Sequence, residues 1–252
     1  RLANLAQAKT VLAARAQERY QAERVEYEAK LHAREEKARQ QGRKPRGPTP
    51  KPPQPGPRAK DQYNFTDPES RIMKNSTNDG FDQHYNAQVA TDHDSLLIVA
   101  YSLSNHANDQ AEVVPTLATL PEALGTPSAG ALDTGYFSAA NIAALEQRGI
   151  EPYIAVGRQA HHHHWSIYCV QPPAPPPDDA SPLVKMAAKL RTEIGQAIYR
   201  LRKCTVEPVF GIIKEVLGFR PFSLRGWAAA AGEWCLVCLA CNLKRLHVLF
   251  AD

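Results

Sequence analysis

The chain has 252 residues, 43% of them hydrophobic, which is enough for one sizeable domain or two small ones. Its five cysteines are few and irregularly spaced, which argues against a disulfide framework and favours a reducing compartment. No uninterrupted apolar run reaches the roughly 18 residues of a membrane-spanning helix, and from the Ala/Gln/Arg-rich opening residues we expect no secretory signal. The first residue is Arg1 rather than Met, so we expect the sequence to start within a longer reading frame.

The net charge of +4 is unevenly distributed along the chain. Residues 1–60 hold 15 Lys/Arg against 6 Asp/Glu, residues 61–184 hold 4 against 15, and residues 185–252 hold 11 against 5. Basic segments around an acidic middle are expected where polyanion binding and a carboxylate metal site share one protein. A solvated charged helix followed by an ordinary acidic domain would give the same pattern, and composition alone does not decide.

The first part of the chain predicts a long helix and then a linker. Residues 1–41 contain neither Gly nor Pro and are rich in strong helix formers. Seven prolines in residues 45–57 exclude regular structure. We therefore assign residues 1–44 to a basic helical insert, either single or a weak coiled coil, residues 45–60 to a Pro-rich linker, and the compact domain to 61–252.

The compact domain begins with strands. Residues 84–104 predict two strands around a polar turn at Asp92–Ser95, the first alternating and the second apolar on both faces. A helix is expected around residues 109–120, with Asp109 as its candidate cap.

A strand, a helix and another strand follow. Residues 128–133 predict a strand that ends at Asp133, and Ser138 then caps an amphipathic helix that stops at Gly149. Residues 151–157 predict a further strand. Strands that alternate with helices indicate an α/β sheet that is parallel in part.

Helices are predicted from a second proline-rich break at residues 171–182 to the end of the chain. Ser181 and Pro182 form a helix start signal, with a cap followed by Pro at the first helical position. Thr205 is the candidate cap of a later helix, and the last helix is apolar nearly all round. The apolar face of the Thr205 helix consists of Val206, Val209, Phe210 and Ile213.

Two acidic residues stand out as candidate metal ligands. Asp133 ends a strand just before the glycine turn at Gly135, a common place to hold a metal or a reacting atom. Glu207, Gly211 and Lys214 fall at i, i+4 and i+7 on one stripe of the Thr205 helix. Taken alone, Asp133 is more often a turn or cap residue, and Glu207 could be an N-terminal charge favoured by the helix dipole.

Several stretches of the chain resemble, in the same order, bacterial insertion-sequence transposases of the DDE class. They include TDPESRIMK (66–74), HYNAQVATD (84–92), LDTGYFSAANIAALEQRGIEPYIAVGR (132–158) and KMAAKLRTEIGQAIYRLRKCTVEPVFGIIKEVLGFRPFSLRG (185–226). The resemblance continues through EWCLVCLACNLKRL (233–246), so it covers nearly everything from Asp61 onward. It implies an RNase H-like mixed sheet with flanking helices.

The resemblance also implies roles for particular residues. The family's Tyr/Arg/Glu/Lys signature has six residues between Glu and Lys, as between Glu207 and Lys214, and the family's second acid corresponds to Asp133. The basic member four places before the Glu is Lys203, where Arg is usual, with Arg202 adjacent. The residues implied to position the DNA backbone are Tyr199, Arg202, Lys203 and Lys214.

The implied cofactor is Mg²⁺ or Mn²⁺, held by Asp133 and Glu207. In such sites two ions about 4 Å apart clamp the attacking and leaving oxygens of a phosphoryl displacement. The family's first aspartate would lie on a core strand upstream of Arg1, since Asp67 sits in a loop and Asp92 at a hairpin tip. We therefore expect an N-terminally truncated transposase that lacks this strand, is marginally stable and is inactive alone.

The implied function is cleavage and transfer of DNA strands at transposon ends, with water and then a 3′-OH as nucleophiles. The implied partners are double-stranded DNA and a second copy in a synaptic complex, at the nucleoid in the bacterial cytoplasm. One alternative is a non-catalytic DNA-binding remnant. Another, an RNase H-like nuclease, would need a complete carboxylate triad in this chain.

Two further clusters could suggest metal binding. The His161–His164 tract is internal, and four consecutive histidines cannot all point one way, so we favour a solvated loop. Cys235, Cys238 and Cys241 recur every third residue on an apolar helix, where core packing is a better explanation than zinc.

Overall fold

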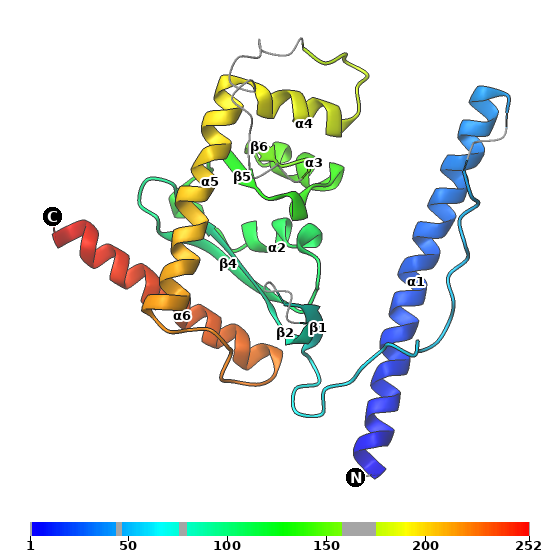
Figure 1. The fold of residues 1–252 in the computed structure, drawn as a ribbon, viewed down its shortest axis with the longest axis horizontal. Helices are drawn as coiled ribbons and strands as arrows, with labels where there is room; N and C mark the ends of the chain where they lie inside the picture. Colours follow the sequence, from blue (N-terminus) through cyan, green and yellow to red (C-terminus); the bar gives the residue numbers. More distant parts are fainter. Residues whose placement is uncertain (1, 44–46, 76–79, 158–174, 252) are drawn as a thin grey trace. The chain divides into compact units, whose positions relative to one another are not determined.

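The computed structural model describes residues 2–43, 47–75, 80–157 and 175–251. The chain divides into two compact units, Arg1–Pro68 and Glu69–Asp252. Figure 1 labels helices and strands of both units.

The first unit is built on one long helix, α1 (Leu2–Gln41), which matches the helix expected from the composition. The proline-rich segment after it forms no helix or strand, but it is tied back to α1 by ion pairs. Arg19 Nη1 lies 2.8 Å from Asp61 Oδ1, and Arg58 Nη2 lies 2.7 Å from Glu23 Oε2. The hydrogen bond from Arg19 lowers the pKa of Asp61. Residues 47–61 therefore lie against α1 and do not act as a free spacer.

The described residues of the second unit contain three separate two-stranded sheets. Two are antiparallel and one is parallel, which confirms a mixed α/β class without joining the strands into one sheet. The antiparallel pairs are β1 (Arg71–Lys74) with β2 (Phe81–His84) and β3 (Asn86–Thr91) with β4 (Ile98–Ser104). The parallel pair is β5 (Ala129–Leu132) with β6 (Glu151–Ile154). The sequence analysis did not predict β1 and β2, which are only four residues long.

The turn between β3 and β4 is held by Asp92. Its carboxylate accepts hydrogen bonds from the Ser95 amide at 2.8 Å and the Ser95 hydroxyl at 2.6 Å. These bonds lower the pKa of Asp92. Asp92 is therefore a turn residue, as its position at the hairpin tip predicted.

Helices and helical turns complete the second unit. They are η1 (Asp109–Ala111), α2 (Val113–Leu117), η2 (Glu122–Leu124), η3 (Thr134–Tyr136), α3 (Ala139–Gln147), α4 (Pro182–Arg191), α5 (Glu193–Gly211), the π-helical turn η5 (Ile212–Val216) and α6 (Trp227–Ala251).

Most predicted helix boundaries are confirmed, with one correction near residue 109. The Ser138 hydroxyl accepts a hydrogen bond from the Asn141 amide at 3.0 Å, and Gly149 ends α3 at φ 74°. Ser181 caps α4 as predicted. The helix expected over 109–120 is instead divided into η1 and α2, and Asn108 rather than Asp109 caps it.

The predicted start of the Glu207 helix is wrong. Helix α5 begins after Thr192, whose hydroxyl accepts a hydrogen bond from the Gly195 amide at 3.0 Å. Thr205 is buried inside this helix, and its hydroxyl donates to the Leu201 carbonyl. Glu207 therefore lies in the last third of α5, where the positive end of the helix dipole cannot act on it. The helix also accommodates Pro208 in its interior.

Two hydrophobic clusters form the core of the second unit. One lies between β4, α5 and α6 and is centred on Trp234; the other lies around β5 and β6 and is centred on Ile154. Helix α5 packs against β3, β5 and β6, so it contacts both the hairpin and the parallel pair (Figure 1). The apolar face is as predicted, with Val209 of α5 and Ile213 of the following turn η5 buried.

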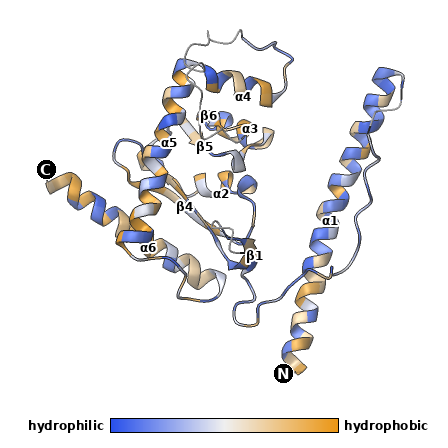
Figure 2. Cartoon of the chain, viewed as in Figure 1, coloured by the Kyte–Doolittle hydropathy of each residue, from blue (hydrophilic) through white to orange (hydrophobic). Residues whose placement is uncertain are grey.

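Helix α6 is long and apolar enough, by length and composition, to cross a membrane. Figure 2 shows apolar residues along much of its length. The sequence analysis did not predict this, because it looked for an uninterrupted apolar run and α6 contains polar residues. However, Asn242 exchanges two hydrogen bonds of 2.8 Å with the Ile98 backbone, and Trp234 is buried on the same side. Only 17% of the apolar stretch of α6 is buried, and Leu236, Leu239 and Leu243 are 65%, 51% and 58% exposed, so only one side of this helix packs on the domain. A single such helix is weak support for a membrane location.

The cysteines of α6 serve packing, as predicted. Cys238 and Cys241 are buried, and the Tyr101 hydroxyl donates to Cys235 Sγ at 3.0 Å. Burial raises the pKa of Cys238 to about 12, so its thiol stays neutral at physiological pH.

Candidate active site

Asp133 lies directly after β5 and uses its two oxygens differently. Oδ1 accepts a hydrogen bond from the Thr134 amide at 2.7 Å, which caps the turn η3. Oδ2 faces Arg202, and the side chain is 58% exposed. Asp133 is therefore the turn residue of the plain interpretation, and its second oxygen, which the turn does not use, faces Arg202.

Glu207 lies on the same side of the domain as Asp133. Arg202 Nη1 is 3.5 Å from Asp133 Oδ2, and Arg202 Nη2 is 3.7 Å from Glu207 Oε1. One guanidinium thus spans the two acids, and we call this pair of contacts the Arg202 bridge. The packing of α5 against β5 produces it, because it brings a helix-borne carboxylate to the end of the strand that carries Asp133.

The Arg202 bridge also distinguishes between the two basic candidates of the signature. Lys203 is exposed and forms no hydrogen bond or ion pair within the described residues, whereas the Arg202 side chain is only 21% exposed. Neighbouring residues of a helix point about 100° apart, so only one of them can face the acids. Arg202 also lies near Tyr199, with its Cζ 5.6 Å from the ring centroid.

Tyr199 belongs to the same cluster through its charge environment. Burial raises the pKa of its phenol, and the negative charges of Asp133 and Glu207 add to this, while Arg202 acts in the opposite sense. Tyr199 is therefore a neutral hydroxyl at physiological pH, suited to donate a hydrogen bond but not to act as a base.

Lys214 does not meet the acids within the described residues. It lies in the π-helical turn η5, with its Nζ 5.9 Å from the Phe210 ring centroid. A π turn rotates less per residue than an α-helix, so Lys214 falls off the predicted stripe of Glu207. Single π turns are frequent at functional sites.

A polar network supports the turn that carries Asp133, and the sequence analysis missed it. The Asp109 carboxylate accepts hydrogen bonds from Asn86 Nδ2 at 2.7 Å and from Gln88 Nε2 at 2.9 Å. A Cβ added to Gly135 would lie 3.1 Å from Asp109 Oδ2, and the Tyr136 hydroxyl donates to Gln88. Only side-chain contacts between β3 and the later turns bring these residues together, so no local pattern could have indicated them.

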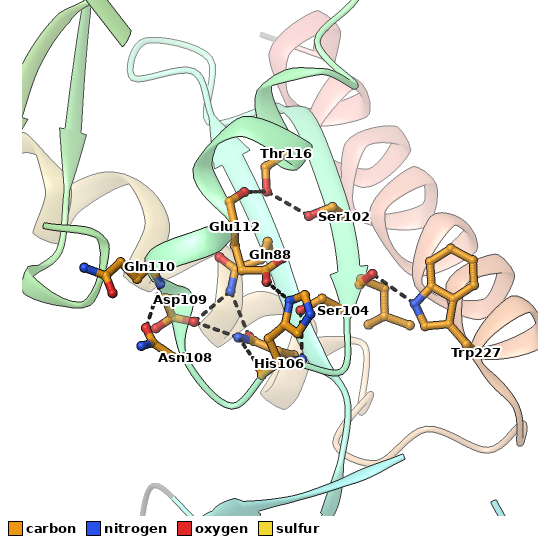
Figure 3. Close-up of polar contacts among 12 residues, drawn as sticks. Gln88, Ser102, Ser104, His106, Asn108, Asp109, Gln110, Glu112, Thr116 and Trp227 are labelled. Atoms are coloured by element: carbon orange, nitrogen blue, oxygen red, sulfur yellow. Dashed lines mark hydrogen bonds and ion pairs between the residues drawn. The ribbon is translucent and has the colours of Figure 1, made fainter. Parts of the chain in front are cut away.

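Figure 3 shows how the same network continues into η1 and α2. Glu112 is 2% exposed, and its Oε1 lies 2.7 Å from His106 Nδ1. Thr116 donates to the Glu112 carbonyl at 2.7 Å and shares a hydrogen bond with Ser102. These contacts attach η1 and α2 to β4 and hold Asp109 in place.

The oxygens of Asp133 and Glu207 are chemically of the kind that suits a divalent metal ion, and they come from two residues. Carboxylate oxygens suit Mg²⁺ or Mn²⁺. Across the parts of the chain that the structure describes, no group of three or more His, Cys, Asp or Glu could hold a metal. Asp67 is buried in the loop before β1, and Asp92 is used by its turn. The His161–His164 tract lies outside the described residues.

One protein-family model matches most of the chain. The family model described as "Transposase DDE domain" matches residues 53–243, which is more than half of the chain. The chain belongs to the transposase DDE domain family. Comparison with curated proteins and with solved structures gives no match. The resemblance stated from the sequence is therefore confirmed at the level of the family, and the matched span of this DDE domain includes Asp133, Arg202 and Glu207.

Proposed function

We propose that this chain is part of an insertion-sequence transposase that cleaves and joins DNA strands by metal-dependent phosphoryl transfer. The observation that carries the proposal is the Arg202 bridge, because it brings an acid of β5 and an acid of α5 to one place. The family assignment supports the reaction class.

Asp133 and Glu207 would hold Mg²⁺ or Mn²⁺. When bound, such ions stabilise the charge that develops on the attacking and leaving oxygens of a phosphodiester. Tyr199 would donate a hydrogen bond to a phosphate, and the guanidinium of Arg202 offers paired donors that match phosphate geometry. Lys203 and Lys214, both exposed, would attract the DNA backbone.

The third carboxylate belongs, in this proposal, to a strand outside the present sequence. The support is that β3–β4 and β5–β6 form separate sheets in the described residues, although α5 packs against both. A strand between β3 and β5 would pair with two edges and could present an aspartate beside Asp133. Without it, two carboxylates leave the ions short of ligands, and this chain alone would not transfer strands.

The proposed partners are double-stranded DNA, bound as transposon ends and target, and a second copy of the protein in a synaptic complex. The proposed location is the bacterial cytoplasm, in contact with the nucleoid. Residues 185–252 carry the excess of basic charge on which such DNA binding would depend.

The test is to express the reading frame extended upstream and to assay Mg²⁺-dependent cleavage of duplexes that carry the transposon ends. The extended protein is expected to cleave, and Asp133→Asn or Glu207→Gln in it to lower the rate by about a thousandfold or more. The present sequence alone is expected to bind DNA without cleaving it. Cleavage by this sequence alone would disprove the placement of the third carboxylate.

The alternative, a non-catalytic DNA-binding remnant, is favoured by one observation. The single positive charge of Arg202 offsets one of the two negative charges, so the two acids are partly screened from each other with no ion bound. If the extended protein binds transposon ends but does not cleave them in Mg²⁺ or Mn²⁺, this alternative replaces the proposal.

A further inference from the structure

We propose that the exposed apolar face of α6 is a dimer interface, which packs antiparallel against the same face of a second copy of this chain. The inference rests on the proposed function for the role of the second copy, but the contact itself is argued from α6 alone. Its test needs neither DNA nor metal, so its failure is distinguishable from failure of the cleavage assay.

The residues of this face recur at the spacing by which two helices pack side by side. From position 232 to position 250, apolar or small residues stand at alternating intervals of four and three residues, and none of them is charged. We call them the α6 seam: Gly232, Leu236, Leu239, Leu243, Leu246 and Phe250. An apolar repeat with a mean spacing of 3.5 residues keeps one line along a helix and is the pattern of a two-helix seam.

The α6 seam lies on the side of the helix that faces away from the core. Trp234 and Cys241 are 2% and 3% exposed, whereas Leu236, Leu243 and Phe250 are 65%, 58% and 85% exposed. Since an α-helix turns about 100° per residue, Leu236 points about 160° away from Trp234, and Leu243 about 160° away from Cys241. A partner on this face would remove large apolar side chains from water, which is the main driving force of association.

An antiparallel pairing of two α6 seams matches residues by size. About a two-fold axis between residues 239 and 243, the pairs across the interface are Leu239 with Leu243, Leu236 with Leu246, and Gly232 with Phe250. A Cβ added to Gly232 would meet nothing within 4 Å, so the Phe250 ring of the second copy has open space there. A parallel pairing would instead set Phe250 against Phe250 and leave a void between the two glycines, which close packing disfavours.

The charges of α6 also favour the antiparallel orientation. Glu233 is the acidic residue of α6 and lies near its start, whereas Lys244 and His247 lie near its end. Antiparallel packing places the carboxylate of one copy beside the basic end of the other and sets the two helix dipoles against each other favourably. Parallel packing would place like charges side by side. A second α6 therefore matches this face in both shape and charge, and a two-fold contact closes at two copies.

The test is sedimentation equilibrium of the whole chain. The unaltered chain is expected to dimerise reversibly as its concentration rises from about 1 to 100 µM, with no larger species. Leu239→Glu is expected to raise the dissociation constant about a hundredfold or more, because each dimer would bury two carboxylates among leucines. Leu124→Glu is the matched control, since Leu124 is 60% exposed and lies in η2, outside α6. The control is expected to stay within about twofold of the unaltered chain.

A mixture of two variants tests the orientation. Leu243→Lys alone is expected to weaken the dimer as Leu239→Glu does. An equimolar mixture of the two is expected to dimerise about tenfold more tightly than either variant alone. The reason is that antiparallel packing sets the new carboxylate against the new ammonium in one layer and leaves an unaltered leucine pair in the other. In a parallel dimer the two substituted positions would not meet, and mixing would give no gain.

Several outcomes would overturn the proposal. A chain that stays monomeric up to about 100 µM has no such interface. Equal dimerisation by Leu239→Glu and Leu124→Glu would place the contact elsewhere, and a mixture no tighter than its components would exclude the antiparallel orientation. A monomer that floats with phosphatidylglycerol vesicles would assign the face to a lipid surface instead.

Folding of the variants is checked by circular dichroism. Leu239 and Leu243 are 51% and 58% exposed, so both substitutions are expected to leave the fold intact. If Leu239→Glu does not fold, Leu236→Glu tests the same seam, because Leu236 is 65% exposed. Unchanged dimerisation by that variant would equally overturn the proposal.

Discussion

At the scale of single residues, Asp133 and Gly135 make their contacts on opposite sides of one turn. Asp133 faces Arg202 and the α5 acid, while Gly135 faces the Asp109 carboxylate behind the turn. Asp109 is held by two amide hydrogen bonds from β3, so it cannot easily move away. The position of the catalytic candidate thus depends on a close contact that a side chain at residue 135 would crowd.

The first prediction concerns this contact. Gly135→Ala is expected to destabilise the domain by about 1 kcal/mol, because its Cβ would meet Asp109 Oδ2 at 3.1 Å. Gly157→Ala is the control, since a Cβ there meets nothing within 4 Å. Urea denaturation followed by tryptophan fluorescence measures both. Equal effects of the two substitutions would contradict the tight contact.

At the scale of elements, α5 and α6 make the second unit a single body although its strands form separate pairs. Helix α5 contacts β3, β5 and β6, and α6 buries Trp234 and Cys238 beside the β3–β4 hairpin. Packing of α5 and α6 against the strand pairs therefore provides part of the stabilisation that a continuous sheet would provide.

The second prediction concerns α6 and pH. The folded pKa of Cys238 is raised to about 12, above its usual 9.0, so its contribution to stability is complete below about pH 9. It is lost as the pH rises from about 9 toward 12. An alkaline titration of Trp234 fluorescence should show the loss, and at pH 8 a thiol reagent should modify exposed Cys204 well before Cys238. Equal rates for the two thiols would contradict the burial.

At the scale of the whole molecule, the described strands offer unpaired edges in three small sheets. Two-stranded sheets are marginal in water unless they pack against other elements, and unpaired edges favour aggregation. The proposed upstream segment would supply two things at once: a third carboxylate for the metal ions and a further strand to pair with the unpaired edges.

The third prediction follows from this deficit. The isolated chain is expected to unfold near or below the lower end of the usual mesophile range of about 45–65 °C, and the upstream-extended protein to unfold at a higher temperature. Differential scanning calorimetry of both proteins measures the difference. A cooperative transition of the present chain well above that range would show that its sheets need no further strand.

The sequence by itself determined the features that depend on neighbours a few residues apart. The long α1, the β3–β4 hairpin and the caps at Ser138 and Ser181 all follow from local hydrogen bonds and periodicity, as does the acid at the end of β5. The family, too, could be identified from the order of such segments.

The tertiary structure alone decided which residues meet. Thr205 has the chemistry of a cap, but packing of α5 across both strand pairs makes it an interior residue. The same packing turns Arg202 rather than Lys203 toward the acids, and strand pairing sets Asp109 against Gly135. The rotation of a helix about its axis and the approach of distant turns are set by contacts far apart in the chain, which a local pattern does not contain.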